Sequence, residues 1–181
     1  MVPEAPLEDT GDGLLPAGEG WFVVNTREAR WYDRGPRGAV CPFEAPGGYE
    51  FSQLGVTLFS LGPGEPMSMY HWEADQEDFL VLSGEALLIV EGEERPLRAW
   101  DFVHCPARAD HTIVGAGGGR AVVLAVGARV DSVGPDWGGY PVHEAAVRHD
   151  ASAERETTSP EEAYARFPDR RPASYEDGWL P

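Results

Sequence analysis

From residue 54 to residue 127, short apolar segments alternate with turns that contain glycine and charged residues. This spacing is typical of an antiparallel β-sandwich or β-barrel rather than of a helical domain. The predicted strands are 54–61, 67–73, 78–82, 86–90, 95–97, 102–105, 111–114 and 120–127. The high content of glycine and proline supports an all-β fold, because both residues favour turns over long helices.

The sequence on either side of this segment has a different character. Residues 1–19 are acidic and rich in proline and glycine, which predicts a flexible N-terminal arm. Residues 20–53 are predicted as an extension with strands, 54–128 as the barrel core, and 129–181 as a C-terminal extension with short helices. We expect these extensions to cover sheet edges or to exchange with a second subunit, and therefore predict a homodimer.

Two short helices are predicted in the C-terminal extension. One lies within residues 141–150. The other begins at Ser159, where a serine cap is followed by Pro160 and by a glutamate at the third helical position, Glu162. It is predicted to end before Pro168.

The strongly acidic composition excludes several classes of partner. The formal net charge is -17 at pH 7, and all 14 basic residues are arginines. A nucleic-acid-binding protein needs a basic surface to displace counterions from phosphates, and an anionic membrane also attracts basic segments. We therefore expect neither nucleic acid nor membrane as a partner, and a small-molecule ligand or substrate instead.

Cysteine content and targeting signals indicate where the protein resides. Only Cys41 and Cys105 are present, which is too few for a disulfide framework. The N-terminus has no basic region followed by an apolar core, and the longest apolar runs are too short to span a bilayer. These observations predict a cytoplasmic protein.

Two segments carry residues that suit metal chemistry. The first runs from Gly64 to Gly84 and contains His71, Glu73 and Glu77. The second runs from Trp100 to His111 and includes Pro106. Together these segments resemble the two motifs of the cupin superfamily. The resemblance implies an antiparallel jelly-roll β-barrel that holds a metal ion among histidine and glutamate side chains.

The first motif can be aligned in two registers. In one register the family's two histidine positions fall on Tyr70 and Trp72. In the other they fall on His71 and Glu73, with one extra residue after Gly64. An extra residue in a loop costs little, whereas a lost imidazole costs the site, so we prefer the second register. Residues 71 and 73 then share one strand face, because side chains alternate along a strand.

The second motif keeps the family's spacing but not all of its residues. Pro106 and His111 occupy the proline and histidine positions. The two glycine positions are occupied by Trp100 and Arg108, and the asparagine position by Gly115.

The resemblance implies that His71, Glu77 and His111 are metal ligands. Imidazole nitrogens combined with one carboxylate suit Zn, Mn, Fe or Ni better than Ca or Mg. Glu73 replaces the family's second histidine, and we consider it a fourth ligand or a catalytic base beside the metal. In the alternative interpretation, His71 and His111 line an apolar pocket and bind no metal. The role of His104 stays open, although a hydrogen-bonded core histidine is the preferred interpretation, and Cys105 is predicted to be buried.

Three classes of function are compatible with these features. The first is a metal-dependent enzyme that acts on a small polar molecule by oxygenase, isomerase or lyase chemistry. The second is a non-catalytic small-molecule-binding protein. The third is a metal-free sugar-modifying barrel, which commonly needs basic residues for a nucleotide diphosphate. The predicted barrel has only four arginines, which weakens the third class. Of the other two classes we prefer the metal-dependent enzyme.

Overall fold

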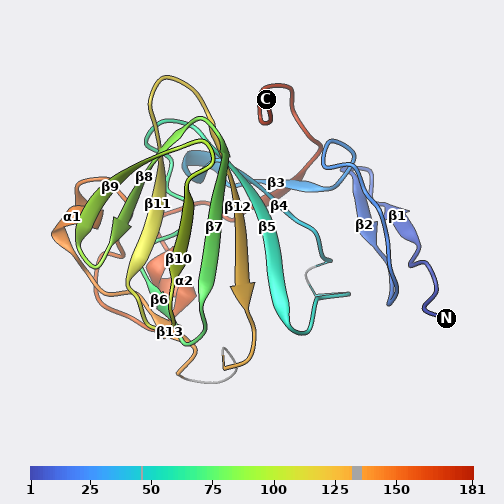
Figure 1. Cartoon of the computed structure of the whole chain (residues 1–181), viewed down its shortest axis with the longest axis horizontal. Coiled ribbons are helices and arrows are strands. Elements are labelled where there is room, and N and C mark those ends of the chain that lie inside the picture. Colours follow the sequence, from blue (N-terminus) through green and yellow to red (C-terminus); the bar gives the residue numbers. More distant parts are fainter. Residues whose placement is uncertain (46, 132–135) are drawn as a thin grey trace.

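The computed structural model describes residues 1–45, 47–131 and 136–181, which form mainly antiparallel β-structure (Figure 1). The larger sheet contains, in spatial order, β10 (Phe102–Cys105), β7 (Glu77–Ser83), β12 (Ala121–Ala128), β5 (Leu54–Leu61), β4 (Ala39–Pro42), β3 (Trp31–Asp33) and β14 (Arg171–Ala173). A second sheet contains β11 (His111–Ala116), β8 (Glu85–Val90) and β9 (Glu93–Arg98). Short pairs are formed by β1 (Leu7–Asp9) with β2 (Leu14–Pro16) and by β6 (Trp72–Glu73) with β13 (Gly138–Gly139).

The main core contains apolar side chains from both sheets. Phe79 and Val81 of β7 and Val123 of β12 are buried in the same cluster as Leu88 of β8 and Ile113 of β11. In β7, buried residues alternate with more exposed ones, as the pleat of a strand requires. In β8, the buried Ile89 belongs to a second hydrophobic cluster. This is the jelly-roll sandwich that the sequence predicted.

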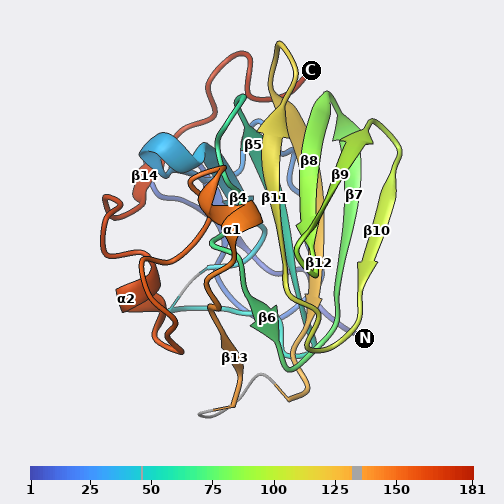
Figure 2. The ribbon, with the colours of Figure 1, turned by 90° about the vertical axis from the view of Figure 1, so that its left-hand side faces the viewer.

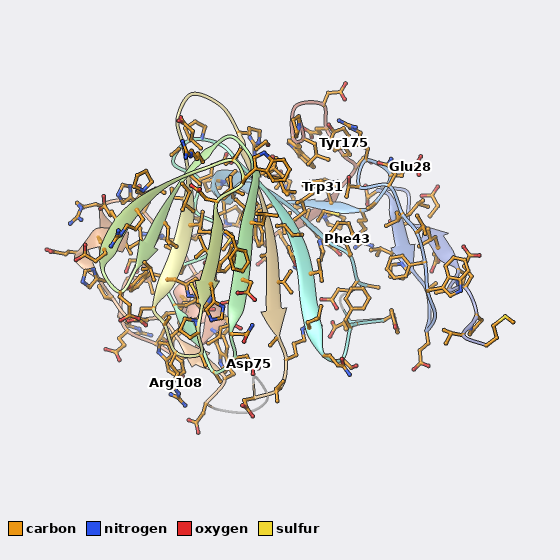
Figure 3. All side chains as sticks on the ribbon, viewed as in Figure 1. Glu28, Trp31, Phe43, Asp75, Arg108 and Tyr175 are labelled. Atoms are coloured by element: carbon orange, nitrogen blue, oxygen red, sulfur yellow. The ribbon has the colours of Figure 1, made fainter. Side chains whose placement is uncertain are left out.

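The two extensions add strands to the edge of the larger sheet. Strand β4 pairs with β5, β3 pairs with β4, and β14 from the C-terminal extension pairs with β3. Beneath them, the fully buried Trp31 packs against Trp179 and Tyr175, with ring centroids 5.2 and 6.1 Å away (Figure 3). The extensions therefore cover the edge of β5, which would otherwise be unpaired.

Several local features differ from the sequence prediction. Residues 1–19, expected as a flexible arm, form the β1–β2 hairpin at the end of the molecule farthest from β9 (Figure 1). Of the predicted strand 67–73, only Trp72 and Glu73 form a strand, β6. The backbone amides of the two residues at 69 and 70 donate hydrogen bonds to the C-terminal extension instead of to a neighbouring strand. The Tyr70 amide donates to the Ala151 carbonyl at 2.6 Å, and the Met69 amide donates to the Tyr164 hydroxyl at 3.1 Å.

The helices are short and lie in the C-terminal extension; α1 lies beside the smaller sheet, whereas α2 lies farther from it (Figure 2). Helix α1 spans Glu144–Val147, within the predicted range 141–150. Helix α2 (Pro160–Ala163) begins as predicted, with the Ser159 hydroxyl accepting a hydrogen bond from the Glu162 amide at 3.3 Å, but it ends five residues before Pro168. No helix in the described ranges is long and apolar enough to cross a membrane.

Two residues at glycine positions of the second motif adopt the backbone conformation that favours glycine. Trp100 has φ of 76° and Arg108 has φ of 70°. The conformation is needed at Trp100 because its amide donates to the Val81 carbonyl at 2.7 Å in the turn between β9 and β10. A side chain with a Cβ atom is strained in this region.

This strain leads to a prediction about Trp100. Its side chain is 74% exposed, so its removal sacrifices little packing. We expect Trp100→Gly to raise the free energy of unfolding by about 0.5–1 kcal/mol, after the entropy cost of glycine is subtracted. Trp100→Ala keeps the Cβ atom and should not stabilise the protein. Urea denaturation of both variants checks this, and an equal effect of the two substitutions would contradict it.

Candidate metal centre

An isolated antiparallel bridge brings His71, just before β6, together with His111 at the start of β11. The His71 amide donates to the His111 carbonyl at 3.1 Å, and the His111 amide donates to the His71 carbonyl at 2.8 Å. Residues paired in this way direct their side chains to the same face. The two imidazole centroids are 4.8 Å apart, and the residues are only 6% and 2% exposed.

Glu77, the first residue of β7, completes a group of three convergent donors. Its Oε2 atom lies 3.1 Å from His111 Nε2 and 3.4 Å from His71 Nε2. One ligand atom from each of the three residues lies within 4.8 Å of the others. The structure therefore brings together the three side chains that the sequence predicted as metal ligands.

Hydrogen bonds on the far side of each imidazole orient it toward this group. Nδ1 of His71 bonds to the Met69 carbonyl and Nδ1 of His111 to the Ala109 carbonyl, both at 2.9 Å. A carbonyl oxygen only accepts, so each Nδ1 carries the proton. In a neutral imidazole, Nε2 then offers its lone pair, which is the usual arrangement of histidine ligands in metal sites.

Two atoms at the centre of this group are buried without a hydrogen-bond partner among the described residues: Glu77 Oε2 and His111 Nε2. Their separation of 3.1 Å is a close contact, but it does not have hydrogen-bond geometry. Buried polar atoms without partners are rare in folded proteins. A divalent ion between them would satisfy both, so the donor set fits a transition metal.

The charges in this group are strongly coupled. Burial disfavours a charged imidazole, but the carboxylates of Glu73 and Glu77 outweigh it and raise the pKa of His71 to about 10. Burial likewise opposes the charge on His111, yet Cys105 and Glu77 raise its pKa to about 9. Burial would raise the pKa of Glu77, but both histidines hold it well below its usual range. A metal ion must displace these protons, so its binding weakens as the pH falls.

Glu73 lies beside the three-residue group. Its Oε1 atom is 3.7 Å from His71 Nε2, so residues 71 and 73 do face the same side. Tyr70 and Trp72, which take the two histidine positions in the other register, make different contacts. The Tyr70 hydroxyl accepts a hydrogen bond from the Gly92 amide at 2.9 Å, and the Arg108 guanidinium covers the Trp72 ring at 4.9 Å.

A cavity of about 330 Å³ opens onto His71, Glu73 and Glu77. Its other walls contain apolar and hydroxyl side chains, including Phe59, Tyr140 and Tyr164. Tyr140 also stacks on the His71 imidazole, with centroids 5.8 Å apart. An adjoining cavity of about 260 Å³ shares Glu73, Glu77 and Phe59 with the first.

Both extensions contribute cavity residues that sequence reasoning missed. Arg34 and Arg37 come from the segment between β3 and β4, whereas Tyr164 and Arg170 follow or precede elements of the C-terminal extension. The sequence contained no local signal for their positions, because these segments reach the cavity through long-range pairing, such as that of β14 with β3 beside Arg170.

The remaining histidines lie outside the site. His104 is on the outer face of β10, and its half-exposed side chain bonds to Asp78 at 2.6 Å, so it is not a core histidine. His143 caps α1 by accepting from the Ala145 amide, and His149 contacts Glu94. Cys105 is buried as predicted, and both cysteines are unpaired thiols.

Comparisons with known proteins identify a known domain within the chain. Residues 57–127 match the cupin domain family. A search of the curated proteins found no match. A predicted oxalate decarboxylase from Thermotoga maritima is 19% identical, with a TM-score of 0.53 over 60% of this chain and 100% of that one. Residues 57–127 therefore form a cupin domain, and the fold of the chain is similar to that of the Thermotoga protein.

Two other solved structures have higher identity but lower structural similarity. A protein from Acidithiobacillus ferrooxidans is 28% identical over 53% of this chain and 63% of its own, with a TM-score of 0.45. A sugar phosphate isomerase of the cupin superfamily from Silicibacter pomeroyi is 27% identical over 58% and 62%, with a TM-score of 0.44. The chain therefore spans less than two thirds of each of these two proteins.

Proposed function

We propose that this protein is a metal-dependent enzyme that acts on a small polar molecule. His71, Glu77 and His111 would hold one divalent transition ion, such as Zn, Mn, Fe or Ni. The observation that carries the proposal is the convergence of three donor atoms, two of them buried and without hydrogen bonds, beside an open cavity. When bound, the ion would supply a Lewis acid that polarises the substrate.

The protein's own side chains would position the substrate and move a proton. Glu73 lines both cavities, so its carboxylate can reach a molecule bound there and accept a proton from it. Tyr140 and Phe59 form apolar walls that limit access of water. Isomerase and lyase reactions commonly use such a combination of an electrophile and a base.

This assignment predicts the behaviour of Glu73→Gln. The variant should keep the metal, because the three convergent donors are intact. It should lose about 100- to 10,000-fold in turnover if Glu73 is the base, which is the usual contribution of a positioned proton acceptor. Metal analysis together with the rate of substrate conversion checks both points. Wild-type turnover by a variant with full metal content would exclude Glu73 as the base.

An experiment can distinguish an enzyme from a binding protein. The metal-loaded protein would be incubated with a panel of sugar phosphates, hydroxy acids and diketones, and the mixtures followed by proton NMR. We expect conversion of at least one compound, its loss after chelation of the metal, and its recovery when the metal is restored. Saturable binding with no chemical change across the panel would favour the non-catalytic alternative.

A further inference from the structure

Three arginines line the same cavity as His71, Glu73 and Glu77. Arg34 precedes the short 3-10 helix Gly35–Arg37, Arg37 is the last residue of that helix, and Arg170 precedes β14. None of the three belongs to the β-barrel strands on which the sequence-based estimate of basic residues rested. The lining of the cavity thus combines two carboxylates and one imidazole with three guanidinium groups.

These arginines have no acidic partner within the described residues, although the chain has 31 acidic and only 14 basic residues. Ion pairs are instead formed by arginines elsewhere: Arg120, Arg129, Arg148, Arg155 and Arg171. Glu65, whose charge acts on Arg34, is itself bonded to Arg120 at 3.0 Å. In so acidic a protein, three arginines that line one cavity without a carboxylate partner can bind an anionic ligand there.

Aromatic rings and backbone carbonyls hold the three side chains in place. Arg34, only 6% exposed, donates to the Met67 carbonyl at 2.7 Å and to the Arg37 carbonyl, and lies over the Phe59 ring. The Arg37 guanidinium stacks on Tyr164, 4.5 Å from its centroid, and Arg170 stacks on Tyr32 at 4.7 Å. Stacking fixes the plane of a guanidinium and leaves its N–H groups free to bind a ligand.

The cluster is electrostatically costly without a ligand. Burial lowers the pKa of Arg34 to about 9, and the charge of Arg37 acts in the same direction. Burial also lowers the pKa of Arg37, and the charge of Arg170 lowers it further. With two carboxylates, three guanidinium groups and a divalent ion, the cavity would carry a net positive charge. An anionic ligand would relieve this repulsion.

We propose that the substrate is a small anion whose carboxylate or phosphate group is bound by Arg37 and Arg170. Arg34 uses its hydrogen bonds on the backbone, so it supplies positive charge and supports Arg37 rather than contacting the ligand. The opposite, polar end of the substrate then faces His71, Glu73 and Glu77 across the cavity. This last step rests on the proposed metal-dependent function, whereas the anion site itself does not.

Calorimetry with defined probes tests the proposal. The protein would be loaded with Ni²⁺, freed of excess ion, and titrated with inorganic phosphate, ribose 5-phosphate, malonate and, as a neutral control, ribose. The double variant Arg37→Gln/Arg170→Gln would be compared with Arg95→Gln/Arg98→Gln, which removes the same charge from exposed positions on β9. If the first double variant fails to fold, Arg170→Gln alone serves, because Arg170 is exposed.

We expect at least one anion to bind wild type and the control variant, and to bind Arg37→Gln/Arg170→Gln about tenfold more weakly or worse. Preference for malonate or for the phosphates identifies the group recognised. Equal affinity in both double variants, or no anion bound by wild type, would overturn the inference. Arginine-dependent binding of an anion by a protein that takes up no Ni²⁺ would instead refute the proposed function and leave the anion site standing.

Discussion

The Glu77→Gln variant should bind divalent metal more than about a hundredfold more weakly than wild type, which is the upper end of the loss caused by removing a partner of a metal ligand. A neutral amide is a poorer donor to a divalent ion than a carboxylate. The Glu77 charge also raises the pKa of both histidines, so its removal reduces competition from protons. Any loss of affinity therefore reports the loss of a ligand.

Glu73→Gln is the matched control, because it makes the same chemical change in a neighbouring carboxylate. Glu73 approaches only His71, at 3.7 Å, whereas Glu77 lies within 3.4 Å of both imidazoles. Competition titrations with a fluorescent chelator would give both affinities. If Glu73→Gln loses the metal while Glu77→Gln retains it, the two carboxylates have been assigned to the wrong roles.

His111→Ala should abolish the stabilisation that metal gives to the wild-type protein. A ligand present at a hundred times its Kd stabilises the folded state by about 2.7 kcal/mol, which corresponds to a rise in Tm of about 5–10 °C for a chain of this size. The comparison is made with and without metal for each protein, so the cavity left by the missing ring cancels. Differential scanning calorimetry at matched concentrations measures the shift.

His104→Ala provides the control for this measurement. It removes an imidazole from the outer face of β10, where the side chain is 50% exposed and bonds only to Asp78. Its Tm should rise with metal as much as that of wild type. A similar metal-dependent rise in His111→Ala would show that the ion binds elsewhere.

Much of the barrel could be predicted because its strands have a clear local signal. The predicted strands 54–61 and 102–105 coincide with β5, which is mainly apolar, and with β10, in which exposed and buried residues alternate. The three candidate ligands could be predicted because the resemblance to the cupin motifs depends on spacing. That spacing persists even where Trp100 and Arg108 occupy glycine positions and adopt positive φ angles.

The rest of the site depends on long-range pairing that leaves no local pattern. Strand β14 pairs with β3, and Arg171 of β14 lies opposite Asp33 of β3. This pairing brings the preceding residue, Arg170, to the cavity. Strand β13 consists of two glycines, which have low strand propensity, and it forms only because β6 lies beside it. The count of four arginines in the predicted barrel therefore underestimated the basic character of the cavity, because Arg34, Arg37 and Arg170 come from the extensions.

Elemental analysis of the purified protein tests the central claim most directly. Wild-type protein and His111→Ala would be expressed and purified in parallel, without chelators or metal-affinity steps, and measured by inductively coupled plasma mass spectrometry. We expect about one transition-metal ion per wild-type chain and far less in the variant, because three convergent donors are the least that such a site uses. Equal metal content in the two proteins, or a wild-type protein that stays free of metal after incubation with Zn, Mn, Fe and Ni salts, would contradict a metal centre at His71, Glu77 and His111.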